Sequence, residues 1–199
     1  MSGAELFEPE LRTRIDQIRA SAEEAWLALN PDLAPNLGEA RRVVGKRQQV
    51  RSHINVFTVS ERMVTKGSAQ RATARAQVAD VKRCRADVAQ QGVEARGRAE
   101  QKGLHQRRDR EVAEHCENAV RWIDGEIVGS APGPIIAWEE ANAGTHVAPL
   151  PIAEARLATA EADVAAATAE LVAALDSWDR RFGVSDARNV EQPAVAEAS

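Results

Sequence analysis

The sequence contains no tyrosine, three phenylalanines and four tryptophans, so aromatic residues make up only 4% of its 199 residues. Hydrophobic residues nevertheless reach 44%, and much of this share is alanine. β-Sandwiches and barrels build their cores from aromatic and β-branched side chains, whereas small side chains suit helices that pack closely. The composition therefore predicts an all-α protein, an elongated helical bundle of coiled-coil-like hairpins.

Cysteines and long apolar runs are scarce as well. The two cysteines, Cys84 and Cys116, do not make a disulfide framework, which favours a reducing compartment. No apolar run approaches the ~18 residues of a membrane-spanning helix, and the first residues do not resemble a secretion signal. We expect a cytoplasmic protein, or a part of an assembly built in the cytoplasm, without membrane insertion.

Motifs that carry chemistry are also missing. The sequence contains no glycine-rich phosphate loop, no nucleophile elbow and no paired-histidine zinc motif. A helical di-metal site needs Glu-x-x-His pairs, and none of the four histidines has a glutamate three positions before it. We therefore predict a protein that is not an enzyme, with no cofactor, no metal and no small-molecule substrate.

One local cluster contains residue types that ligate metals: Glu111, Glu114, His115, Cys116 and Glu117. Glu111 and His115 lie on one face of a helix, but a metal would need a further ligand, such as Cys84 across a hairpin. The simpler interpretation is a solvated acidic face beside a cysteine that packs as a small hydrophobic residue. We adopt this interpretation, and a helical metalloprotein is the weakest of our hypotheses.

The mild net charge of −4 conceals three blocks of opposite sign. Residues 1–40 carry −5 (8 acids and 3 bases), residues 41–110 carry +12 (6 acids and 18 bases), and residues 111–199 carry −11 (16 acids and 5 bases). The preferred explanation is a bundle whose basic middle helices pair with acidic outer helices along the flanks of the seams.

The alternative explanation of the charge order is a basic surface for phosphates. Five basic residues beside the apolar positions of the middle block would form it: Arg71, Arg75, Lys82, Arg85 and Arg96. Few aromatic residues accompany them, so the sequence favours nonspecific contacts with nucleic-acid backbones over base stacking.

Two acidic helices, residues 9–30 and 152–182, carry apolar residues at alternating spacings of 3 and 4, which is typical of coiled-coil seams. We predict that these seams contact partner helices through Leu11, Ile15, Ile18, Leu157, Val164, Leu171, Leu175 and Trp178. The core has few large side chains, so we expect other chains to bury part of the seams.

Residues 37–128 are predicted as a basic helical region. Within it, residues 50–59 are rich in β-branched side chains, so a short β element is the alternative there. Helix is favoured, because the rest of the sequence offers no strand to pair with it.

Apolar positions in this region include Cys84 and Val88 before a polar gap, and Val112 and Cys116 after it. We favour an antiparallel hairpin with its bend near residue 100, in which Cys84 faces Cys116 and Val88 faces Val112. One continuous helix of roughly 90 Å is the competing interpretation.

Residues 129–151 are rich in proline and glycine and are predicted as a linker, anchored to the bundle by Ile135, Ile136 and Trp138. Residues 1–183 would then form a single elongated helical domain. A polar, alanine-rich tail, residues 184–199, is predicted to be disordered.

The sustained seams and the missing catalytic motifs together favour a non-enzymatic structural or interaction protein. We expect it to form a homo-oligomer or to join a larger assembly, such as a scaffold, a virion or a secretion apparatus. The alternative is a nonspecific nucleic-acid-binding protein that uses the basic block of residues 41–110.

Overall fold

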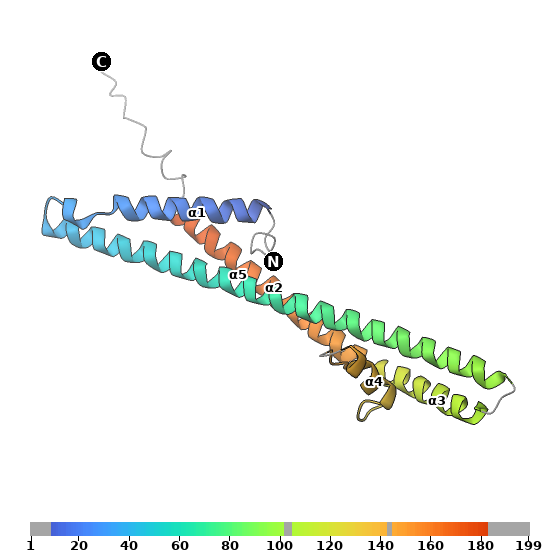
Figure 1. Ribbon diagram of the computed structural model, residues 1–199. Helices are drawn as coiled ribbons and strands as arrows, with labels where there is room; N and C mark the ends of the chain where they lie inside the picture. Colours follow the sequence, from blue (N-terminus) through green and yellow to red (C-terminus); the bar gives the residue numbers. More distant parts are fainter. Residues whose placement is uncertain (1–8, 102–104, 143–144, 183–199) are drawn as a thin grey trace, which may run out of the picture. The chain divides into compact units, whose positions relative to one another are not determined.

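The computed structural model describes residues 9–101, 105–142 and 145–182. The α-helices in these ranges are α1 (Pro9–Ala28), α2 (Leu37–Glu100), α3 (Gln106–Ile123), α4 (Gly133–Ala141) and α5 (Leu150–Phe182), with a short 3₁₀ helix, η2 (Pro31–Leu33), between α1 and α2 (Figure 1). The described ranges contain no strand, which confirms the prediction of an all-α protein.

The chain divides into two compact units. Unit 1 comprises residues 1–68 and 164–199, and unit 2 comprises residues 69–163. Both α2 and α5 contribute their two ends to different units. The predicted disordered tail lies outside the described residues.

Unit 1 is a packing of three helices, α1, the first part of α2 and the last part of α5. Each helix contributes one apolar stripe to a common core, in which the deeply buried residues are Ile15, Ile18, Ala22, Val50, Phe57, Val64, Leu171, Leu175 and Trp178. The spacings within each stripe are those of one helix face. The seams predicted from the sequence therefore meet one another inside this unit.

The β element suggested for residues 50–59 is wrong, because this segment is helical throughout. Val50 and Phe57 lie seven residues apart and both face the core, as a helical period requires. The remaining valines of the segment, Val56 and Val59, are more than half exposed on the other side of the helix. The β-branched residues thus lie on two different faces of α2, one buried and one exposed.

Two asparagines shape the connection from α1 to α2. The Asn30 side chain accepts a hydrogen bond from the Asp32 amide at 3.0 Å, and the Asn36 side chain accepts one from the Glu39 amide at 2.9 Å. Each bond satisfies an amide that has no acceptor inside the new helix, so η2 and α2 both begin directly after an asparagine.

Unit 2 contains the antiparallel hairpin favoured by the sequence: α2 ends at Glu100, and α3 returns along it from Gln106 (Figure 1). The register differs from the predicted one. A Cβ built on Gly92 would lie 3.0 Å from Cys116 Cβ, so Gly92, and not Cys84, faces Cys116. Cys84 lies eight residues earlier, about 12 Å along the helix axis.

The segment predicted as a linker, residues 129–151, contains a helix, α4. Ile135 is fully buried and Trp138 is 8% exposed, whereas Ile136 is 46% exposed and does not anchor the segment. The Trp138 indole N–H donates to Asp87 Oδ2 at 2.8 Å, which fastens α4 to α2. Proline at the start and one apolar face make this short helix.

Glycine is needed where α3 ends. Gly125 has a φ of +76°, and a Cβ at this position would lie 3.0 Å from Pro151 Cγ. The Glu126 amide donates to the Arg121 carbonyl at 2.9 Å, and the Gly125 amide donates to the Trp122 carbonyl at 3.0 Å. This pair of bonds is a Schellman cap, which requires the left-handed conformation at the glycine.

Two glycines of α2 give a matched test of the α2–α3 contact. We expect Gly92→Ala to lower the free energy of unfolding by about 1–3 kcal/mol, because the new methyl meets a Cβ fixed to the backbone of α3. Gly97→Ala has open space around its new methyl and is expected to raise the free energy by up to about 1 kcal/mol through helix propensity. Chemical denaturation measures both, and equal effects would contradict the close contact.

Candidate functional site

The predicted seam residues lie inside the two cores. In unit 1, Ile15, Ile18, Leu171, Leu175 and Trp178 are buried, and Leu11 packs against them. Contact of these residues with a partner chain stays a prediction. The prediction assumed that other chains bury part of the seams, whereas helices of the same chain bury them in unit 1.

The apolar seam of α5 contributes residues to the cores of both units. Val164, 8% exposed, belongs to unit 1, whereas Leu157 packs against the core of unit 2. The regular spacing along α5 therefore does not define one continuous contact face.

The basic residues predicted to bind phosphates are largely engaged with carboxylates of the same unit. The pairs are Arg75 with Glu161 (2.8 Å), Lys82 with Glu154 (3.3 Å), Arg85 with Asp124 (2.7 Å) and Arg96 with Glu117. Arg71 has no ion pair with a described residue. These pairs follow the preferred explanation of the charge blocks, in which the basic helix lies against acidic ones.

Arg85 and Asp124 form the best-defined of these pairs. Arg85 Nε and Nη2 donate to the two carboxylate oxygens of Asp124 at 2.7 and 2.8 Å. The hydrogen bond to Arg85 lowers the pKa of Asp124, and the reciprocal bond raises the pKa of Arg85. The bidentate geometry joins α2 to the end of α3 and leaves little of either charge for an external phosphate.

A different surface, which we call the α2 outer face, carries basic residues without such partners. It consists of Arg41, Val44, Arg51, Val56, Val59, Arg62, Met63 and Lys66, all within about 80° of Val59 when each residue turns ~100° around the helix. The four apolar members are 43–57% exposed. The four basic members form no ion pair or hydrogen bond with a described residue.

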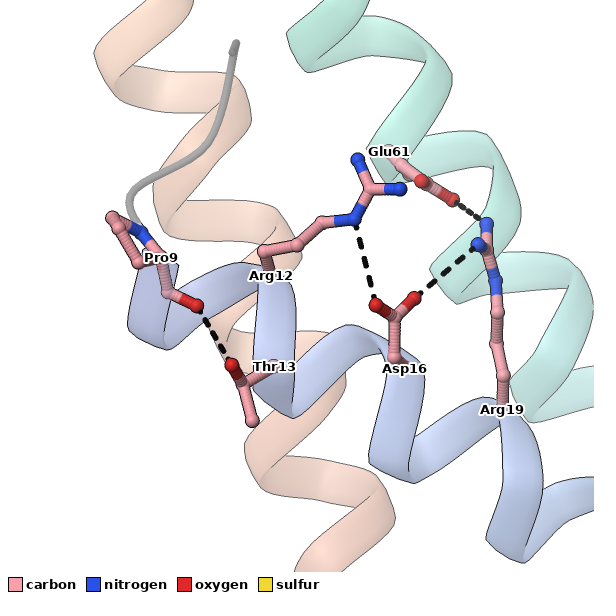
Figure 2. Close-up of polar contacts among 6 residues, drawn as sticks. All are labelled: Pro9, Arg12, Thr13, Asp16, Arg19 and Glu61. Atoms are coloured by element: carbon pink, nitrogen blue, oxygen red, sulfur yellow. Dashed lines mark hydrogen bonds and ion pairs between the residues drawn. The ribbon is translucent and has the colours of Figure 1, made fainter. Parts of the chain in front are cut away.

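The α2 outer face has no acidic member. Between residues 41 and 66 the single acid is Glu61, which lies on the opposite side of α2 and pairs with Arg19 of α1 at 2.5 Å. Figure 2 shows this pair together with Asp16, which Arg19 and Arg12 approach at 3.9 and 3.5 Å. The single acid of this part of α2 thus points toward α1, and the α2 outer face contains only basic and apolar residues.

Unit 1 also contains an apolar cavity of about 260 Å³ between its three helices. Its walls include the aromatic rings of Trp26, Phe57 and Trp178, and small side chains such as Ala22 and Ala174 leave the space open. Arg19, Glu23 and His53 are its polar lining residues.

His53 borders this cavity beside a cation. The Arg181 guanidinium, which can only donate, lies 3.2 Å from His53 Nε2, a contact that suits the neutral ring with its proton on Nδ1. Burial, and then the charge of Arg181, lower the pKa of His53. The ring packs edge-on against Phe182, with centroids 5.5 Å apart. His53 is therefore a packing residue that tolerates protonation poorly.

The cysteines and the acidic cluster of α3 do not form a site. Both thiols are free and buried, and burial raises the pKa of Cys84 to about 12 and raises that of Cys116. His115 is exposed, whereas Cys116 points into the core. Among the described residues no group of three or more His, Cys, Asp or Glu side chains could hold a metal ion.

None of the described helices is long and apolar enough to cross a membrane. No protein-family model, no curated protein and no solved structure matches the chain.

Sequence reasoning missed the α2 outer face. The signal was present: Val56, Val59 and Met63 are spaced by 3 and 4 residues, out of phase with the core stripe of Val50, Phe57 and Val64. Val56 and Val59 also add to the β-branched content of residues 50–59, so their helical spacing becomes visible only when the two faces of the helix are considered separately.

His53 predicts a pH dependence of stability. Because its pKa is lowered in the folded protein, the unfolded chain takes up the proton first, so stability is present above about pH 6.5 and is lost as the pH falls toward the folded pKa. Arg19 and Glu23 of α1 and Arg181 of α5 are the charged groups around it.

We expect His53→Gln to remove this part of the pH dependence, measured by urea unfolding on both sides of about pH 6.5. His115→Gln, at an exposed position, is the control and should retain the dependence of the wild type. Identical profiles for the wild type and His53→Gln would contradict the assignment.

Proposed function

We propose that this chain is a non-enzymatic interaction protein that takes part in a protein assembly, with the α2 outer face as its docking surface. The observation that carries the proposal is the exposure of Val56, Val59 and Met63 at helical spacing beside unpaired basic side chains. Exposed apolar positions of this kind, rimmed by charge, are typical of surfaces that bind another protein. A cytoplasmic location, as a scaffold or a similar component, belongs to the same proposal.

The role of the predicted seams changes within this proposal. Their side chains stabilise the fold of each unit, so they are not the surface that a partner would meet. A docking surface must be accessible, and its apolar and charged side chains must lack partners within the chain. In the described part of unit 1 the α2 outer face meets both conditions.

Nonspecific binding of nucleic acid is the second candidate. The observation in its favour is the set of four basic side chains on the α2 outer face, which could contact backbone phosphates. No aromatic residue belongs to this face, so stacking on bases would not contribute. The basic residues first expected to bind phosphates are the weaker choice, because most of them are paired.

Size-exclusion chromatography with light scattering on the untagged protein, recorded at 260 and 280 nm, tests both candidates. We expect a mass above the 21.6 kDa of one chain that falls on dilution, without nucleic acid. Val56→Ser with Val59→Ser should lower the mass, because these side chains lose their apolar contact. Val93→Ser, at another exposed valine of α2, is the matched control and should not.

A mass of one chain at every concentration would contradict assembly of this chain with itself. Co-purifying nucleic acid that is lost at moderate salt would favour the second candidate instead.

A further inference from the structure

The chain itself contains a helix that fits the α2 outer face, namely α1. The face extends from residue 41 to residue 66, about 38 Å, and α1, with 20 residues, is about 30 Å long. A partner helix that lies along the face must offer acids to its basic residues and apolar or small side chains to its valines.

The outward side of α1 has this chemistry. Ala20, Glu23, Glu24 and Leu27, which we call the α1 outer face, follow one another at helical spacings of 3, 4 and 7 from Ala20, away from the buried stripe of Ile15, Ile18 and Ala22. Glu23 is exposed at the edge of this face, where it also borders the cavity of unit 1. Leu27 is 68% exposed. Glu23 and Glu24 form no ion pair with a described residue.

We propose that the α1 outer face of one copy docks on the α2 outer face of a second copy. Glu23 and Glu24 meet the basic residues of the α2 outer face, and Leu27 covers exposed valines. The inference rests on the proposed function and names the partner as the same chain. Two α2 outer faces cannot meet each other, because both are basic and would repel.

Contact between unlike faces has a consequence for assembly. Each copy carries one α1 outer face and one α2 outer face, so every copy can offer and accept the contact. Such contacts close into a symmetric particle where the geometry permits a closed ring, and otherwise they continue into larger assemblies.

Charge reversal with mixing tests the inference. E23K with E24K reverses the charge of the α1 outer face, and R62E with K66E reverses the charge at the Arg62–Lys66 end of the α2 outer face. We expect each variant alone to associate about tenfold more weakly than the wild type, because like charges then oppose each other. An equimolar mixture of the two variants should recover association, because the reversed faces are complementary to one another.

The matched control for R62E with K66E is R108E with R110E. It makes the same change of charge at exposed positions of α3 in unit 2, and it should leave association unchanged. Circular dichroism of each variant verifies the fold. Raised salt should weaken association of the wild type, which provides a measurement without any variant.

A wild type that associates while both variants keep its mass, or variants whose mixture does not recover, would overturn the contact between these faces and leave the proposed function standing. A wild type that is monomeric at every concentration would overturn this inference, while docking of a different protein on the α2 outer face would still stand as the proposed function. Variants that dissociate singly and recover as a mixture would support the contact, because loss of folding cannot produce that recovery.

Discussion

In each unit a glycine of α2 lies against a neighbouring helix, and the rest of the structure depends on how closely these contacts let the backbones approach. A Cβ on Gly67 would lie 3.1 Å from Val164 Cγ2, and one on Gly92 would lie 3.0 Å from Cys116 Cβ. With few aromatic residues available, close approach is the means by which narrow stripes bury enough apolar surface. It also explains why Gly67 and Gly92 lie inside α2 despite the cost of glycine in helix propensity.

Close approach of the helices brings their charged flanks together as well. In unit 2 the basic residues of α2 then lie beside acids of α3, α5 and the connecting segment, and Arg85 with Asp124 is the strongest example. Most such pairs are exposed and add little to stability. Their significance is that they account for most of the basic residues of unit 2 that the sequence suggested for phosphate binding.

Much of the fold follows from the sequence, since the helices, the seams and the bend near residue 100 all come from periodicity and glycine placement. The hairpin register does not, because a seam with repeating spacings fits almost equally well when it is shifted by whole turns, and the observed shift of eight residues is about two turns. In the observed register Gly92 faces Cys116 and leaves room for its close approach. The site was harder to predict, because a residue's charge is visible in the sequence but its partner in space is not.

The α2 outer face differs from the rest of α2 in what its side chains do for the fold. More than half of Val56 and of Val59 stays exposed within the chain, and valine favours a helix less than alanine or lysine does. The exposed part of their apolar area contributes stabilisation only when another surface covers it. The basic residues beside them restrict that surface to an acidic one, since approach of a like charge in a desolvated contact is unfavourable. In the proposed assembly, fold and docking would use different faces of the same helix, so a change on the outer face would alter assembly without disturbing the core.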